Sequence, residues 1–185
     1  MLAATAIALG FIGGFLSGGA FKGLAELRIR YEWAVLISFL VQGVARGRLE
    51  GTTASPWATA VWTSISVMLA ILLFLNRRAP GALIAGAGVL INVDVVLANH
   101  GMPVVVDASN RALTAVGNSG GFYHVAGPAT VLAWAGDVLR FQAFGGLELV
   151  SVGDVLLVVG VAVIVAQAML ESHDDVGSAQ RPISA

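Results

Sequence analysis

Residues 91–104 read INVDVVLANHGMPV, and this stretch determines how the rest of the chain is interpreted. It lies inside a long apolar run, carries the polar side chains of Asn92, Asp94 and Asn99, and leaves the run through a Gly-Met-Pro sequence. Before it, apolar runs alternate with short polar segments, and after it come a glycine-rich region and one more apolar run. This order predicts membrane helices with one long connection outside them.

The composition is that of an integral membrane protein. Of the 185 residues, 57% are hydrophobic and 11% are charged, whereas a soluble domain carries about 25% charged residues. The net charge of −1 provides no basic surface for nucleic acid. With no cysteine and three widely separated histidines, the chain shows no disulfide, no thiolate nucleophile and no recognisable metal-ligand spacing. We therefore expect a lipid bilayer as its surroundings, and no cofactor.

The predicted fold is all-α: a polytopic membrane protein forming a bundle of five transmembrane helices. The helices are predicted at residues 2–19, 31–45, 56–76, 81–98 and 155–170. The first is interpreted as a retained helix and not a cleaved signal, because no basic residue precedes Lys22. Residues 1–170 would form one membrane domain, and residues 171–185 a polar, mobile tail.

The long glycine-rich loop between helices 4 and 5 spans residues 99–150. Its uncharged part, residues 112–136, could be mistaken for a sixth span. Glycines, a proline and Asn/Ser clusters interrupt that part, however, and irregular backbone is tolerated only outside lipid or against protein. We expect an outer or re-entrant cap.

Basic residues predict the orientation. One side of the predicted bundle holds six: Lys22, Arg28, Arg30, Arg77, Arg78 and Arg181. The other side holds four: Arg46, Arg48, Arg111 and Arg140. The larger group is expected in the cytoplasm, which places the N-terminus and the long loop outside and the C-terminus inside.

Three glycines in the first helix, Gly10, Gly14 and Gly18, recur every four residues. Small residues at this spacing allow two helices to approach closely in lipid, so we expect a packing face here. The alternative interpretation is that these glycines have no packing role, because glycine is more frequent in membrane helices than in soluble ones.

The polar residues of the fourth helix allow two interpretations. Asn92 and Asn99 lie two turns apart on one face, and Asp94 is offset from Asn92 by about 200°. A carboxylate within a bilayer is costly and often functional, which suggests a proton- or cation-handling acid. Alternatively, Asp94 lies near the headgroups, and the asparagines form interhelical hydrogen bonds or end the helix.

A short repeat contains two further aspartates. AGDVL at residues 135–139 recurs as VGDVL at residues 152–156. Ser151 and Asp154 have capping-box spacing ahead of an apolar run, and Asp137 could begin a short helix over residues 138–141. Helix starts are favoured over a paired-carboxylate site.

Several short landmarks follow one another in a fixed order: Gly18-Gly19 with Leu24-Ala25-Glu26-Leu27-Arg28, Asn92, Asn99, Gly101-Met102-Pro103-Val104, Gly136-Asp137 and Val150-Ser151-Val152-Gly153-Asp154-Val155-Leu156. In this order they resemble the bacterial membrane family catalogued as domain of unknown function 5317. Family members typically read Asn-Gly-Gly-x-Met-Pro where this chain has Asn99 to Pro103, one residue shorter, and carry an aliphatic residue at Asp94. The resemblance implies a protein of the bacterial cytoplasmic membrane, without a known activity or catalytic residue.

Three function classes follow. The leading hypothesis is a non-catalytic membrane component that binds a protein partner or lipid through its outer cap, with homo-oligomers also possible. The alternative is a small ion-coupled carrier that uses Asn92, Asp94 and Asn99. The third is a membrane-surface enzyme with Asp137, Asp154 and His100 gathered at one site.

Overall fold

The computed structural model describes residues 2–49, 56–105, 122–143 and 146–178, and it is mostly helical. Its helices are α1 (Leu2–Leu16), α2 (Phe21–Glu26), α3 (Glu32–Leu49), α4 (Pro56–Leu75), α5 (Ala82–Asn99), the 3-10 turn η1 (Ala133–Ala135) and α7 (Val152–Ser178). Its strands are β1 (Met102–Val104), β2 (Tyr123–Val125), β3 (Asp137–Ala143) and β4 (Gly146–Ser151).

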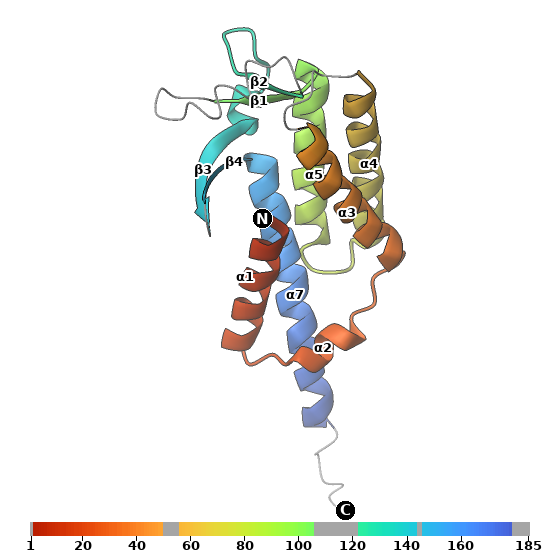
Figure 1. The fold of residues 1–185 in the computed structure, drawn as a ribbon. Coiled ribbons are helices and arrows are strands. Elements are labelled where there is room, and N and C mark those ends of the chain that lie inside the picture. Colours follow the sequence, from red (N-terminus) through yellow and green to blue (C-terminus); the bar gives the residue numbers. More distant parts are fainter. Residues whose placement is uncertain (1, 50–55, 106–121, 144–145, 179–185) are drawn as a thin grey trace, which may run out of the picture.

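Helix α7 lies at the centre of the bundle (Figure 1). Helix α1 packs on one side of it and α5 on another, while α4 packs against α5 and α3 packs against α4. The five long helices lie where the apolar runs predict them. Their ends shift by a few residues, and α7 continues to Ser178, into the region predicted as a mobile tail. Residues 179–185 of that tail lie outside the described residues.

Two of these helices have the length and apolarity of a membrane span. They are α5, residues Ala82–Asn99, and the Val152–Glu171 part of α7. In the described part of the chain, the apolar stretches of the other three long helices are shorter: Ala4–Leu16, Glu32–Gln42 and Thr59–Leu75.

A four-stranded sheet occupies the region predicted as an irregular loop, so the all-α prediction is wrong there. The strand order is β2-β1-β3-β4, in which β1 is parallel to both neighbours and β3 is antiparallel to β4. The sheet lies over the end of the bundle formed by the C-terminus of α5 and the N-terminus of α7 (Figure 1). Residues 106–121 of the predicted loop lie outside the described residues.

The short helix predicted after Asp137 is also absent, because residues 137–143 form strand β3. Their pairing with β4 supplies the hydrogen bonds that a helix would otherwise make locally. Apolar side chains from α5, from the sheet and from the segments next to it then form a core beneath the sheet: Val95, Val96, Met102, Val104, Phe122, Tyr123, Ala135 and Leu149.

Two helix ends show how the chain changes direction. Gly18 lies beyond the end of α1 with φ +85°, and Gly19 N–H donates to Gly14 O over 2.8 Å. At the end of α5, His100 has φ +57° and Gly101 N–H donates to Val96 O over 3.0 Å. Both ends have the Schellman pattern. His100, rather than Asn99 or Gly101, therefore adopts the left-handed conformation expected at this exit.

Close helix packing depends on glycine. A Cβ atom added at Gly10 would lie 2.6 Å from Val165 Cβ, and one added at Gly14 would lie 2.6 Å from Met169 Sδ, so both glycines face α7. Gly18, predicted to share this packing face, has nothing within 4 Å of an added Cβ and instead belongs to the turn. This packing leaves α1 lying closely along α7.

Candidate functional site

Three buried residues form a closed hydrogen-bond ring where α5, β4 and α7 meet. Asn92 Nδ2 donates to Asp154 Oδ1 over 3.0 Å, Asp154 N–H donates to Ser151 Oγ over 2.9 Å, and Ser151 Oγ–H donates to Asn92 Oδ1 over 2.7 Å. Ser151 N–H also donates to Asp154 Oδ2 over 3.4 Å, which completes the predicted capping box of α7. We refer to Asn92, Ser151 and Asp154 as the junction ring.

The junction ring is shielded from solvent. The exposed fractions are 6% for Asn92, 0% for Ser151 and 7% for Asp154. A polar group buried this deeply is costly unless it is paired, and a charge is costlier still. The Asp154 carboxylate accepts hydrogen bonds from the Asn92 side-chain amide and from the Ser151 backbone N–H. It also lies at the positive end of the α7 dipole. The ring therefore stabilises a helix N-terminus against a neighbouring helix.

Glycines bring the two helices close enough for this ring. A Cβ atom added at Gly153 would clash with Asn92 Oδ1 and with Gly88 O, and one added at Gly88 would lie 2.8 Å from Leu157 N. Farther along the same pair, a Cβ atom at Gly160 would lie 2.6 Å from Gly81 O. In each helix the two glycines are seven residues apart, which is about two helical turns, so both pairs of contacts lie on the same face of their helices.

Asp137 lies next to the junction ring in the sheet. It is 3% exposed, and in the strand register it pairs with Ser151 on β4 and with Val104 on β1. Both aspartates of the sequence repeat are therefore neighbours of Ser151: Asp137 pairs with it across the β3–β4 ladder, and Asp154 binds it at the start of α7. Pro103, on β1, is also buried, and a Cβ atom added at Gly136, the residue before β3, would clash with Pro103 O.

Asp94 and Asn99 lie apart from the junction ring. Asp94 is exposed on α5, whereas its neighbours Val93 and Val95 are buried. Asn99 Nδ2 donates to Val131 O over 2.8 Å, and Asn99 Oδ1 accepts from Val131 N–H over 2.9 Å. The three polar residues of α5 thus have three separate environments.

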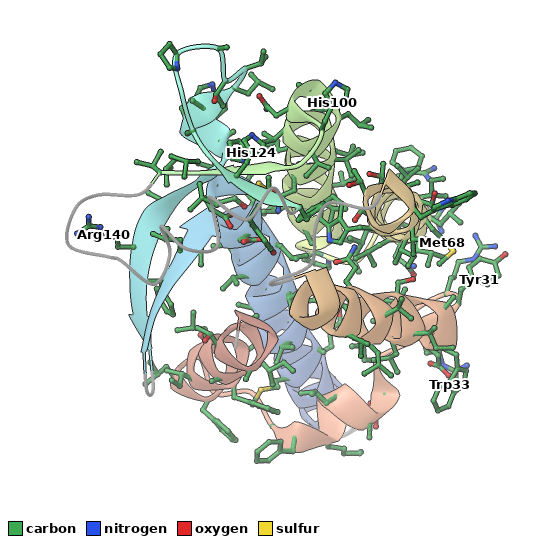
Figure 2. All side chains as sticks on the ribbon, turned by 45° about the horizontal axis from the view of Figure 1, so that its top comes forward. Tyr31, Trp33, Met68, His100, His124 and Arg140 are labelled. Carbon is green, nitrogen blue, oxygen red and sulfur yellow. The ribbon has the colours of Figure 1, made fainter. Side chains whose placement is uncertain are left out.

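The histidines of the cap also lie in different environments (Figure 2). His100 is exposed at the C-terminal end of α5, eight residues beyond Asn92 of the junction ring. His124 lies partly buried on β2, and burial lowers the pKa of its imidazole below the usual value of 6.5. Among the described residues, no group of three or more His, Cys, Asp or Glu side chains is arranged to hold a metal ion.

Sequence reasoning missed two contributors to these contacts. Ser151 is recognised as a cap but not as the partner of Asn92, because the latter contact joins residues 59 apart. The line of glycines between α5 and α7 is also missed, although the equal spacing of Gly81 to Gly88 and of Gly153 to Gly160 is visible in the sequence. Matching intervals in two apolar helices are the signal that could have identified it.

One protein-family model matches residues 26–166, and it is described as a family of unknown function, DUF5317. The chain belongs to DUF5317. No curated protein and no solved structure matches it.

Several landmarks that make the sequence resemble DUF5317 meet at the cap. Asn92, Ser151, Gly153 and Asp154 form the junction ring and its close approach, and Asp137 lies across the strand pair from Ser151. Met102 belongs to the apolar core directly above. In this member of DUF5317, the landmarks thus build the joint between the helix pair and the sheet.

Proposed function

We propose that this DUF5317 protein is a multi-pass protein of the bacterial cytoplasmic membrane whose five long helices all span the bilayer. The support is the apolar outer surface of the bundle, since large exposed apolar side chains occur on every long helix and not only on α5 and α7. On α1, α3 and α4 they are Ile7, Leu9, Ile12, Phe15, Leu16, Trp33, Leu36, Ile37, Leu40, Val44, Trp57, Val61, Val67, Met68, Ile71, Phe74 and Leu75. Water would disfavour this surface, and lipid would cover it.

Cysteine labelling tests the proposal cleanly, because the natural chain contains no cysteine. Ala129→Cys lies on the cap, Ala25→Cys on α2 at the opposite end, and Ser64→Cys midway along α4; all three positions are exposed. In intact cells, a membrane-impermeant maleimide should label residue 129 only. Residue 25 should react after the cells are lysed, and residue 64 only in detergent.

Labelling of residue 64 in intact membranes would refute a span at α4. Labelling of residue 25 but not residue 129 in intact cells would reverse the proposed sidedness. Release of the protein by alkaline carbonate extraction would refute membrane integration altogether.

We further propose that the cap is a non-catalytic docking element. The observation that supports this is a rigidly held apolar loop: Asn99 binds both backbone polar groups of Val131, and next to it Leu132 adopts φ +54°. Val131 is 52% exposed and Trp134 is 63% exposed. A tryptophan on a backbone that is already held in place requires little further ordering of the loop on binding, and tryptophan is enriched among residues that dominate binding energy.

A photocrosslinking amino acid at residue 134, in native membranes, tests the docking proposal. We expect a discrete adduct that is absent when the same amino acid replaces Ala129, an exposed neighbour on the same loop. A protein adduct would identify a partner, and a lipid adduct would assign the loop to the membrane surface. Equal, diffuse crosslinking from both positions would refute a docking role for the loop.

A further inference from the structure

Two basic segments that are far apart in the chain lie together at the end of the bundle opposite the sheet. Arg28 and Arg30 belong to the connection between α2 and α3, whereas Arg77 and Arg78 follow α4. The side chain of Asn76 joins the segments: its Oδ1 accepts from Arg30 N–H over 2.7 Å, and its Nδ2 donates to Arg30 O over 3.0 Å. Asn76 is 9% exposed, so its side of this contact is buried, whereas Arg30 remains exposed.

We refer to Arg28, Arg30, Arg77 and Arg78 as the arginine rim. All four side chains are exposed. Within the described part of the chain, no carboxylate lies within 4.0 Å of their guanidinium groups, and the ion pair observed nearby joins Lys22 to Glu26 over 3.6 Å. The rim therefore presents positive charge that is not neutralised by these carboxylates.

Aromatic rings hold part of this charge in place. The Arg30 guanidinium carbon lies 5.6 Å from the centre of the Tyr31 ring, and that of Arg77 lies 4.9 Å from the centre of the Phe74 ring. Figure 2 shows Tyr31 and Trp33 projecting outward at the start of α3, where Tyr31 is 57% and Trp33 71% exposed. Amphipathic aromatic residues at a helix end are typical of the boundary between headgroups and acyl chains.

A shallow depression that is open to solvent lies at the same place. It is lined by Arg28, Ile29, Tyr31, Glu32, Trp33 and Ala34. Its lining combines the basic Arg28 and the acidic Glu32 with apolar and aromatic side chains, so a guanidinium group and an apolar surface lie next to each other, as the phosphate and acyl chains of a phospholipid require.

We propose that the arginine rim binds the phosphodiester headgroup of an anionic phospholipid, with its acyl chains lying along the exposed apolar side chains of α3 and α4. Guanidinium groups donate paired hydrogen bonds to phosphate oxygens, and basic clusters at membrane surfaces attract anionic lipids. The inference rests on the proposed membrane location. It assigns a ligand class to the end of the bundle opposite the cap.

Native mass spectrometry in a neutral detergent, with phosphatidylglycerol as the titrated probe and phosphatidylcholine as the neutral comparison, tests the proposal. We expect the wild-type protein to retain phosphatidylglycerol in preference to phosphatidylcholine. The double variant Arg28→Gln/Arg77→Gln removes one charge from each segment and leaves Asn76 intact. It should weaken phosphatidylglycerol binding by about 25-fold, or about fivefold for each basic side chain at an anionic surface.

The matched control is Arg46→Gln/Arg48→Gln, which makes the same charge change toward the other end of α3. It should bind phosphatidylglycerol as the wild type does. Equal loss in both double variants, or no preference in the wild type, would refute the proposal. Full competition by millimolar inorganic phosphate would show that a free anion, not a lipid, is the ligand. A protein that remains soluble without detergent would refute the membrane location itself.

Discussion

Replacing Ser151 by alanine tests whether the junction ring holds the sheet to the helices. Ser151 makes two contacts that alanine cannot make: its hydroxyl accepts from Asp154 N–H and donates to Asn92 Oδ1. Loss of a serine N-cap costs about 1 kcal/mol. Leaving the buried Asn92 carbonyl unpaired costs about 1–3 kcal/mol. We therefore expect Ser151→Ala to lower the free energy of unfolding by about 2–4 kcal/mol.

Ser38→Ala is the matched control. Ser38 is also 0% exposed, but its hydroxyl donates over 2.7 Å to Ala34 O in the same helix. No buried partner side chain loses a bond on its removal, so we expect a loss below about 1 kcal/mol. Both variants remove the same hydroxyl group, and the comparison therefore isolates the ring.

Equilibrium unfolding in mixed detergent micelles, followed by circular dichroism, measures both losses. The double variant with Asn92→Leu should be less destabilised than the sum of the two single variants, by about 1 kcal/mol or more, because both substitutions break the same contact. A stabilising role of the ring would be refuted if Ser151→Ala lost no more stability than Ser38→Ala and if the losses of the single variants added up in the double variant. The contact between Ser151 and Asn92 would then contribute nothing measurable to stability.

Three further predictions concern the contact between α5 and α7, the end of α5 and a partly buried histidine on β2. Gly153→Ala should cost about 1–3 kcal/mol through overpacking against α5, measured by the same unfolding assay, and a loss below about 0.5 kcal/mol would contradict the close approach. His100→Gly should raise the free energy of unfolding by about 1 kcal/mol, since it relieves a non-glycine residue at φ +57°; no gain would place the strain elsewhere. For His124, burial lowers the folded-state pKa, so the unfolded chain binds more protons below about pH 6.5, and the free energy of unfolding should fall as the pH falls from 7.5 to 5.5. Comparison with His124→Gln isolates this contribution, and identical pH profiles for the two proteins would contradict it.

The helices were predictable because their signals are local. Apolar runs place the five long helices, Pro56 begins α4, and Ser151 caps α7, each within a few residues of the sequence that specifies it. The family resemblance was also visible in the sequence, because it depends on short local motifs and their order along the chain and not on long-range contacts.

The sheet was not predictable in this way, because its strands are defined by partners far along the chain. Strands β1 and β2 have three residues each, too few to show alternation, and they pair across the intervening residues 105–122. Asp137 follows a glycine and precedes apolar residues, which is also how a helix begins, and only its pairing with β4 decides between the two structures.

The candidate site was partly predictable. The period of α5 places Asn92 and Asp94 on different faces, and the structure does so. Nothing local indicates that Asn92 bonds to a serine 59 residues later, since that contact depends on the glycine-lined approach of α5 to α7. The packing of α5 against α7, and not the local sequence, therefore determines which residues meet Asn92.

The direct joining of helices to strands has a mechanical consequence. Strand β4 ends at Ser151 and α7 begins at the next residue, while β1 begins three residues after α5 ends. These short joins leave no hinge between the sheet and either helix, so a change in the angle between α5 and α7 would have to shear the sheet. The sheet and the helix pair are therefore expected to move together as one unit, and not as a lid hinged on the bundle.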